Sequence, residues 1–315
     1  MKILHIVPGT SDISNGMVVV ARLIAKEQGD ASVLDLNSGL KEVARPAVEE
    51  VWVHGMWLPK EWAVCWNVLK SGKRLVRMTH GSLSPIYLRC QSPLKKFLVS
   101  PIERYLLRKA SKVIATCQAE SDWIRSYLGH RCPPILLTDL KRFFNLDKRS
   151  DLLSNLDSRS DLLSKLDFRS DLKSHLHLLY LGRRHPLKGL SYLEAAVRQL
   201  SSVPSSLFPV PPQLKVVSNA FGEELEKVWD WCDVLVLPTL SDNFGLVIAE
   251  ALERGKRVIT TDGAPAWSPS ASAAEDKGDG DDYGGRLIYL RGYRDGSPED
   301  RVRLLRDAIT SLANA

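Results

Sequence analysis

The first 140 residues alternate short apolar runs with longer stretches in which apolar residues recur at helical spacing. Short apolar runs bounded by polar or turn residues are typical of buried strands, and their alternation with helices predicts parallel βαβ units with right-handed crossovers. Helices are expected, for example, over residues 17–26 and 119–128. The predicted strands cover residues 3–7, 32–34, 51–54, 75–79, 113–116 and 135–137.

A second alternating block begins near residue 177 and continues to the end of the chain. Its last helix is expected to start at Ser297, a natural N-cap, with Pro298 in the first helical position. In parallel sheets of this kind, ligands bind beyond the carboxyl ends of the strands. The strands predicted here cover residues 178–181, 214–217, 234–237 and 257–261, and the helices cover residues 190–200, 223–231 and 244–254.

Two segments break the alternation. Residues 145–174 hold three copies of a ten-residue unit, too short a period for a repeat fold, and we interpret them as a polar linker. The pattern therefore predicts an α/β protein with an N-terminal domain over residues 1–144, this linker, and a C-terminal domain over residues 175–315. Residues 268–285 are rich in Gly, Ser and Asp and are expected to form a loop.

The distribution of apolar residues and cysteines indicates which kinds of protein to expect. The chain has no run of eighteen apolar residues, so no transmembrane helix is expected, and its first residues lack a signal-peptide cleavage site, which predicts a cytoplasmic protein. The five cysteines have no Cys-x-x-Cys pair and no nearby His at metal spacing. We expect free thiols and no metal site.

Charge is distributed unevenly. Residues 1–144 contain 21 Lys and Arg against 12 Asp and Glu, a net +9, whereas residues 145–315 contain 22 against 25, a net −3. A basic half favours an anionic partner such as a phosphorylated acceptor, a membrane face or a nucleic acid. Residues 95–112 concentrate this charge in an amphipathic pattern, which fits either a surface helix facing its own core or membrane attraction. Because no base-reading motif is recognisable, no nucleic-acid partner is expected.

A strand, loop and helix near residue 240 carry the clearest chemistry. The strand over residues 234–237 is followed by a polar loop, and the helix is expected to begin near Phe244 and Gly245. Free N–H groups at a helix tip bind anions, and glycine lets a ligand approach closely. Glu250 lies about 7–8 Å along this helix, which suits the ribose of a nucleotide whose diphosphate sits at the tip. Spacing leaves open the alternative of an ordinary surface Glu.

The run over residues 242–252, with its flanks, resembles the signature of the group-1 (family 4) retaining glycosyltransferases, which have the GT-B fold. That family has Glu, seven residues, then Glu. Here Glu250 is the second carboxylate and Asp242, one methylene shorter, stands in the first position. The resemblance implies that Glu250 binds the ribose hydroxyls and Asp242 the donor sugar, with Asn243, Phe244 and Gly245 at the diphosphate.

Residues 178–190 resemble a second element of that family, a strand followed by Gly-Arg and then Lys-Gly before a helix. The resemblance implies that Arg183 and Lys188 clamp the donor diphosphate; the alternative is a basic surface loop. Two cations opposite a helix tip can neutralise a leaving diphosphate without a metal. The expected co-substrate is therefore a nucleotide sugar, and no metal or other cofactor is expected.

The N-terminal half resembles the family in fewer residues. Gly16 stands where the family has a glycine in the loop that opens the first helix, near the diphosphate. His80, followed by Gly81, resembles the family's His-Gly and is implied to contact the donor sugar or the acceptor. His54 ends another strand, where it either lines the acceptor side or belongs to the core.

Taken as a whole, the resemblance implies two Rossmann-like domains facing across a cleft, the second shortened because no Gly-rich nucleotide loop follows residues 214–217. It implies a retaining hexosyltransferase that acts on a glycan or lipid-linked acceptor of the cell-envelope polysaccharide or lipopolysaccharide type. The basic first domain suggests peripheral contact with an anionic membrane at its inner face. The alternative is a glycosyltransferase-like binding subunit with weak or no catalysis. The expected catalytic residues are His80, Asp242, Arg183 and Lys188.

Overall fold

The computed structural model describes residues 2–10, 15–146, 176–202, 208, 210–269, 283 and 285–314. It contains two compact units, unit 1 (Met1–Phe143) and unit 2 (Phe144–Ala315). Nearly all of the three-copy segment, and most of the loop predicted over residues 268–285, lie outside the described residues.

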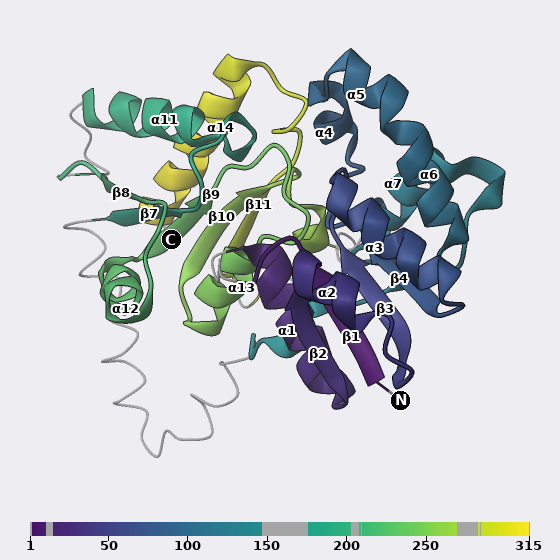
Figure 1. Cartoon of the computed structure of the whole chain (residues 1–315). Helices are drawn as coiled ribbons and strands as arrows, with labels where there is room; N and C mark the ends of the chain where they lie inside the picture. The colour runs from purple at the N-terminus through teal and green to yellow at the C-terminus, as the bar shows by residue number, and fades with distance from the viewer. Residues whose placement is uncertain are drawn as a thin grey trace. The chain divides into compact units, whose positions relative to one another are not determined.

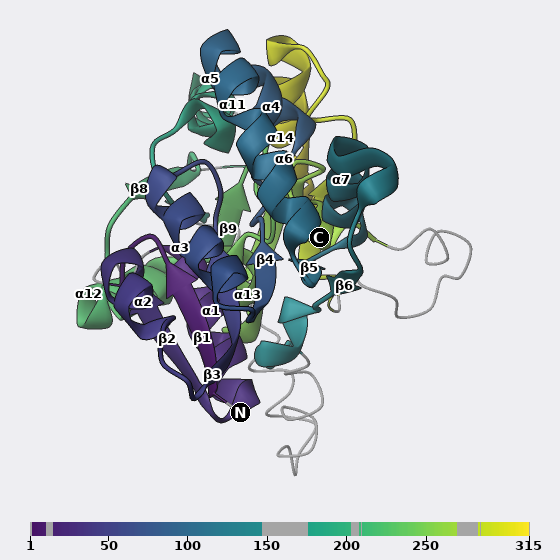
Figure 2. The ribbon, with the colours of Figure 1, turned by 45° about the vertical axis from the view of Figure 1, so that its right-hand side comes forward.

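Unit 1 is built on a six-stranded parallel sheet of order β2-β1-β3-β4-β5-β6 (Figure 1, with β5 and β6 labelled in Figure 2). Every strand predicted for this part of the chain is present, with ends that differ by a few residues. Because β2 pairs with one side of β1 and β3 with the other, the sheet is doubly wound, with its switch point between β1 and β3. The strands are β1 (Lys2–Val7), β2 (Ala31–Asp35), β3 (Val48–His54), β4 (Arg74–Met78), β5 (Lys112–Ala115) and β6 (Ile135–Leu137).

The first two helices of unit 1 begin at residues whose side chains cap them. The Asn15 side chain accepts from the Met17 amide at 3.1 Å, and Asp35 accepts from the Ser38 amide at 3.0 Å. Helix α3 packs against α6 (Figure 2). The helices are α1 (Gly16–Gln28), α2 (Leu36–Glu42), α3 (Pro59–Lys70), α4 (Pro85–Cys90), α5 (Pro93–Leu98), α6 (Ser100–Lys109), α7 (Gln118–Leu128), η1 (Gly129–Arg131) and η2 (Leu140–Phe143).

A buried ion pair crosses the core of unit 1. Arg77 on β4 and Glu103 on α6 are both fully buried, and they approach to 3.3 Å. Arg77 also donates to the Gly55 carbonyl at 2.9 Å, while Glu103 accepts from the Trp57 amide and from Trp62 Nε1 at 2.8 Å. Because buried charges need partners, this network fixes the loop that follows β3.

Unit 2 contains a five-stranded parallel sheet of order β11-β10-β9-β7-β8. The four strands predicted here are confirmed, and Leu287–Leu290, which was not predicted, adds β11 beside β10. The chain starts in β7, moves outward to β8 and returns to β9 on the other side of β7, so the switch point lies between β7 and β9. The other strands are β7 (His177–Leu181), β8 (Gln213–Val217), β9 (Val234–Leu237) and β10 (Arg257–Thr261).

In unit 2, α11 and α14 lie side by side over one face of the sheet (Figure 1). Ser297 caps α14 as predicted, because its Oγ accepts from the Asp300 amide at 3.1 Å. None of the helices that the structure describes is both long and apolar enough to cross a membrane. The helices are η3 (Pro186–Lys188), α11 (Leu190–Ser202), α12 (Gly222–Trp231), α13 (Leu246–Glu253), η4 (Pro265–Trp267) and α14 (Pro298–Asn314).

Candidate active site

The switch point of unit 2 brings two loops together that are distant in sequence. The loop after β7 carries Arg183 and Lys188, and the loop after the neighbouring strand β9 carries Asp242. The Leu240 amide donates to the Leu187 carbonyl at 2.8 Å, and the Thr239 hydroxyl donates to the same oxygen at 3.1 Å. The two motifs that the sequence suggested separately therefore form one surface at the carboxyl ends of the strands.

Lys188 and Asp242 form an ion pair between these loops. The ammonium of Lys188 contacts Asp242 Oδ2, and the two side chains are 19% and 21% exposed. Asp242 Oδ1 accepts from the Gly245 amide at 3.1 Å, and the Asp242 amide donates to the Gly263 carbonyl at 2.8 Å. Both oxygens of this carboxylate are engaged, so it holds Lys188 in place and also closes the turn that precedes α13.

Two glycines allow the backbones of these loops to touch. A Cβ atom on Gly189 would lie 1.9 Å from the Pro238 carbonyl oxygen, and one on Gly263 would lie 2.1 Å from the Thr239 carbonyl oxygen. Neither distance is sterically allowed. The site therefore depends on glycine at both positions.

The tip of α13 differs slightly from the prediction. The helix begins at Leu246, two residues after the expected start, because Gly245 adopts a left-handed conformation with φ of 67°. Phe244 is buried, and its carbonyl accepts from Trp267 Nε1. Within the described part of the chain, the amides of Leu246 and Val247 have no acceptor. The first turn thus offers free N–H groups, as an anion site requires.

Glu250 is the fifth residue of α13 and is half-buried. Burial raises the pKa of its carboxyl group, Arg254 opposes this rise, and Glu253 and Glu226 add to it. Arg254 forms its ion pair with Glu226, at 2.8 Å. Among the described residues the Glu250 carboxylate has no hydrogen-bond donor. A shielded carboxylate without a partner is typical of a binding site.

The structure does not bring Arg183 into this arrangement. Its side chain is exposed and forms no ion pair with any residue that the structure describes, although its carbonyl accepts from the Tyr180 hydroxyl at 2.8 Å. Burial raises the pKa of Tyr180 to about 12, and the nearby negative charge of Asp242 adds to this effect. Asn243 lies half-buried in the turn before α13. The roles implied for Arg183 and Asn243 remain predictions.

In unit 1, Gly16 is the first residue of α1 and is exposed at the carboxyl end of β1, where the sequence led us to expect a helix-opening glycine. Residues 11–14 of the same loop lie outside the described residues.

His80 lies just beyond the carboxyl end of β4 with a φ of 49°, in the left-handed region that is unusual for a residue with a side chain. Glu120 holds this turn in place: one carboxylate oxygen accepts from the Thr79 hydroxyl at 2.6 Å and from the Gly81 amide at 2.7 Å, and the other accepts from the Thr116 amide at 2.8 Å. Glu120 is not among the site residues predicted from the sequence, because no neighbouring motif marks it.

His80 is also part of a line of histidines. His80 Nε2 lies 2.8 Å from His54 Nδ1, and His54 Nε2 lies 2.9 Å from His5 Nδ1. His54 is fully buried, so its side chain does not form part of the surface. The sequence did not single out His5, which lies in the middle of the first strand.

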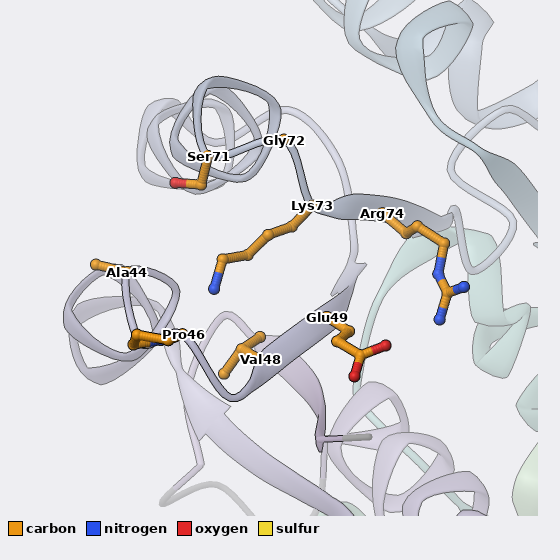
Figure 3. Close-up of a pocket in the computed structure, with 8 residues that line it drawn as sticks. All are labelled: Ala44, Pro46, Val48, Glu49, Ser71, Gly72, Lys73 and Arg74. Atoms are coloured by element: carbon orange, nitrogen blue, oxygen red, sulfur yellow. The ribbon is translucent and has the colours of Figure 1, made fainter.

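An open pocket of about 540 Å³ lies at the amino-terminal ends of the unit 1 strands, opposite to their carboxyl ends (Figure 3). Its lining residues come from the amino ends of β3 and β4 and from the segments before them, and the Lys73 side chain extends across it. Parallel sheets bind ligands at their carboxyl edge, and no candidate residue lines this pocket, so it is not the predicted site. The lining residues are Ala44, Pro46, Val48, Glu49, Ser71, Gly72, Lys73 and Arg74.

Comparison with known proteins found no matching family model and no matching curated protein. Solved structures do match. Sucrose-phosphate synthase from Thermosynechococcus elongatus is 16% identical, with a TM-score of 0.62 over 99% of this chain and 90% of that chain.

The Anabaena protein HepE in complex with UDP-glucose is 15% identical, with a TM-score of 0.60 over 99% of this chain and 90% of that chain. A UDP-forming α,α-trehalose-phosphate synthase from Burkholderia vietnamiensis is 12% identical, with a TM-score of 0.58 over 99% and 91%. Such identities establish the fold and not the activity. The chain has the GT-B fold, built from two Rossmann-like α/β domains.

Proposed function

We propose that the protein is a nucleotide-sugar-dependent glycosyltransferase that transfers a hexosyl group with retention to a glycan or lipid-linked acceptor of the cell-envelope type. The observation that carries this proposal is the switch point of unit 2. There Lys188, Asp242 and the first-turn N–H groups of α13 converge, and the carboxylate of Glu250, which has no hydrogen-bond donor among the described residues, lies one turn further along the helix. A similar fold is solved with UDP-glucose bound, which supports the same ligand class.

The geometry suggests how the donor would bind. Its diphosphate would accept hydrogen bonds from the first-turn amides of α13, and Gly245 leaves room for the close approach. Glu250 lies four residues after Leu246, about 6 Å along the helix axis, within reach of a ribose attached to that diphosphate. A carboxylate accepts well from two vicinal hydroxyls.

Donor binding would compete with Asp242 for Lys188. An arriving diphosphate is a stronger anionic partner than one carboxylate, so the ammonium would turn toward it, and Arg183 would close from the solvent side. Asp242 would stay anchored on the Gly245 amide, with its second oxygen freed for a sugar hydroxyl. We propose that these two cations and the helix tip stabilise the leaving diphosphate without a metal.

Unit 1 would supply the remaining contacts. We place Gly16, at the tip of α1, near the diphosphate, and we place His80 against the transferred sugar or the acceptor. The turn that Glu120 holds keeps His80 at the carboxyl edge of its own sheet.

We also propose that unit 1 makes peripheral contact with an anionic membrane at its cytoplasmic face. Phe97 and Leu98 of α5 are 78% and 54% exposed, and Tyr105 of α6 is 43% exposed, whereas Leu106 and Leu107 point into the core. The buried Leu106 and Leu107 fit a surface helix that faces its own core, and the exposed Phe97 and Leu98 support the proposed membrane contact. Exposed apolar side chains among basic ones are typical of interfacial segments.

The test is direct binding of UDP-, GDP- and ADP-sugars, followed by donor hydrolysis and transfer assays. At a hundred times its dissociation constant, the correct donor should raise the free energy of unfolding by about 2.7 kcal/mol. If no nucleotide sugar binds and none is hydrolysed, the proposal is wrong.

A second candidate is a binding subunit without turnover. The observation that favours it is the short carboxylate of Asp242, already engaged by Lys188 and Gly245. Asp242→Glu separates the two: a gain in transfer rate supports an enzyme, whereas unchanged donor binding with no transfer by either form supports a binding subunit.

A further inference from the structure

We propose that His5, His54 and Gln28 are positioning residues that fix the tautomer of His80, so that His80 Nδ1 accepts a hydrogen bond from a substrate hydroxyl. The inference rests on the proposed function only in its last step, where His80 meets a substrate. The hydrogen-bonded line itself is a property of unit 1.

The line follows from the register of the sheet. His5 on β1 pairs with Trp52 on β3, two residues before His54, and His54 pairs with Met78 on β4, two residues before His80. Since residues two apart point to the same face of a sheet, the three imidazoles lie on one face along a diagonal. At its inner end, His5 Nε2 lies 2.8 Å from Gln28 Oε1, at the last residue of α1.

The direction of these hydrogen bonds is determined at Gln28. Its amide oxygen only accepts, so His5 Nε2 must carry a proton and His5 Nδ1 must accept. His54 Nε2 then donates to His5, and His54 Nδ1 accepts from His80 Nε2. A neutral imidazole has one proton, so His80 Nδ1 is left with a bare lone pair. Among the residues described in the structure, Nδ1 has no partner.

The surroundings keep all three imidazole rings neutral, as the order of donors and acceptors along the line requires. Burial lowers the pKa of His5 and of His80 to about 4, against opposing effects of Gln28 and Glu50 at His5 and of Glu120 at His80. Burial lowers the pKa of His54 well below its usual value, and His80, His5 and Arg77 act in the same direction. Each ring is therefore uncharged at neutral pH.

The ends of the line are held rigidly. His5 stacks on Trp52 with ring centroids 4.9 Å apart. His80 is kept in its left-handed conformation by the Glu120 clamp. A non-glycine residue in this region is strained, and such strain clusters at functional sites. This backbone conformation points the His80 ring back to His54.

The test uses two substitutions at Gln28, which is half-buried at the end of a helix and is not itself proposed to contact a substrate. Gln28→Glu offers only acceptors and should keep the direction of the line. Gln28→Lys offers only donors and should reverse it. The readout is the tautomer of each histidine, measured from ¹⁵N chemical shifts of the full-length protein at pH 8, where a raised His5 pKa would not interfere.

In the wild type and in Gln28→Glu we expect His80 protonated at Nε2, and in Gln28→Lys we expect it protonated at Nδ1. The same His80 tautomer in both variants, or a wild-type His80 protonated at Nδ1, would overturn the inference. Because this readout requires no turnover, it stands even if no donor is found.

If transfer is measured, Gln28→Lys should lose about tenfold in kcat/KM, the effect of turning one acceptor into a donor, while Gln28→Glu should stay within about twofold of wild type. A reversed tautomer with unchanged kcat/KM would refute the contact of His80 with substrate and leave the proposed transferase activity intact.

Discussion

The ammonium of Lys188 contacts the carboxylate of Asp242 across two loops that are 54 residues apart in sequence. Each belongs to a motif whose resemblance to the glycosyltransferase family implies donor binding. Because the two side chains pair with one another, a donor would have to displace this contact to bind either of them. In the proposed donor site, this pair would link the state of the diphosphate subsite to that of the sugar subsite.

Removing the charge of Asp242 should release Lys188. Asp242→Asn keeps an oxygen that can accept from the Gly245 amide, so the turn should persist. We expect donor affinity to rise by a few fold while the transfer rate falls by at least about tenfold, since the sugar contact is weakened. Calorimetry and initial rates measure the two effects.

Lys188→Met is the matched variant, and it should weaken donor binding by about tenfold or more. If Asp242→Asn weakens donor binding as much as Lys188→Met does, the donor diphosphate does not compete with Asp242 for Lys188.

Glu250→Gln should lower affinity for the nucleotide by about tenfold, because a neutral amide is a poorer acceptor for two hydroxyls. It should not destabilise the free protein, since the carboxylate is half-buried and its raised pKa shows that its charged form is disfavoured in the fold. Glu223→Gln, at an exposed position of α12, is the control for loss of one charge.

The pH dependence of Glu250 has a defined sign. Its pKa in the folded protein is raised above the ordinary value of 4.5, so folding favours the protonated form. Above the raised pKa, the charged carboxylate lowers the free energy of unfolding by the full amount. This destabilisation disappears as the pH falls through the raised pKa to below 4.5. The stability advantage of Glu250→Gln over wild type, measured by urea unfolding, should therefore shrink between neutral pH and pH 4. An advantage that grows with acidity would contradict this.

Gly189→Ala should abolish donor binding by separating the two loops. Gly189 and Gly255 have similar left-handed backbones, with φ of 67° and 72°, but only at Gly189 would a Cβ meet another backbone. Gly255→Ala should cost about 1–2 kcal/mol from its conformation and leave donor affinity unchanged. If the two variants lose equal stability and equal donor affinity, the close contact of the loops is not required for donor binding.

Arg77→Met should reduce the free energy of unfolding by about 3–5 kcal/mol, because it leaves the fully buried Glu103 without its cation. The pair of the exposed Arg45 and the half-buried Glu42 provides the comparison: Arg45→Met should cost less than about 1 kcal/mol. Chemical denaturation of both variants measures these two losses. A similar loss of unfolding free energy in both variants would contradict the prediction.

Phe97→Ser with Leu98→Ser should lower binding to vesicles that contain anionic lipid by about tenfold, because two exposed apolar side chains no longer insert. Leu136→Ser, on the exposed edge strand β6, is the control for loss of surface apolarity. Sedimentation with vesicles measures both. Equal retention of vesicle binding by the double variant and the control would rule out this segment as the membrane contact.

The sequence by itself determined most of the strands, because buried parallel strands are short apolar runs between helices. It also suggested Lys188, Asp242, Gly245 and Glu250 as site residues, through the resemblance of residues 178–190 and 242–252 to two elements of the glycosyltransferase family. β11 escaped notice although residues 287–290 are apolar, because a Gly- and Asp-rich stretch separates it from the regular alternation.

Only the tertiary structure decided which of these residues meet. Lys188 and Asp242 contact one another because β9 returns beside β7 and not beside β8, and strand order is not encoded in local periodicity. In the same way, His5, His54 and His80 form one line because the register of three strands places them on a diagonal. A single position in a strand predicts burial, whereas hydrogen-bond partners across a sheet depend on how the whole sheet is assembled.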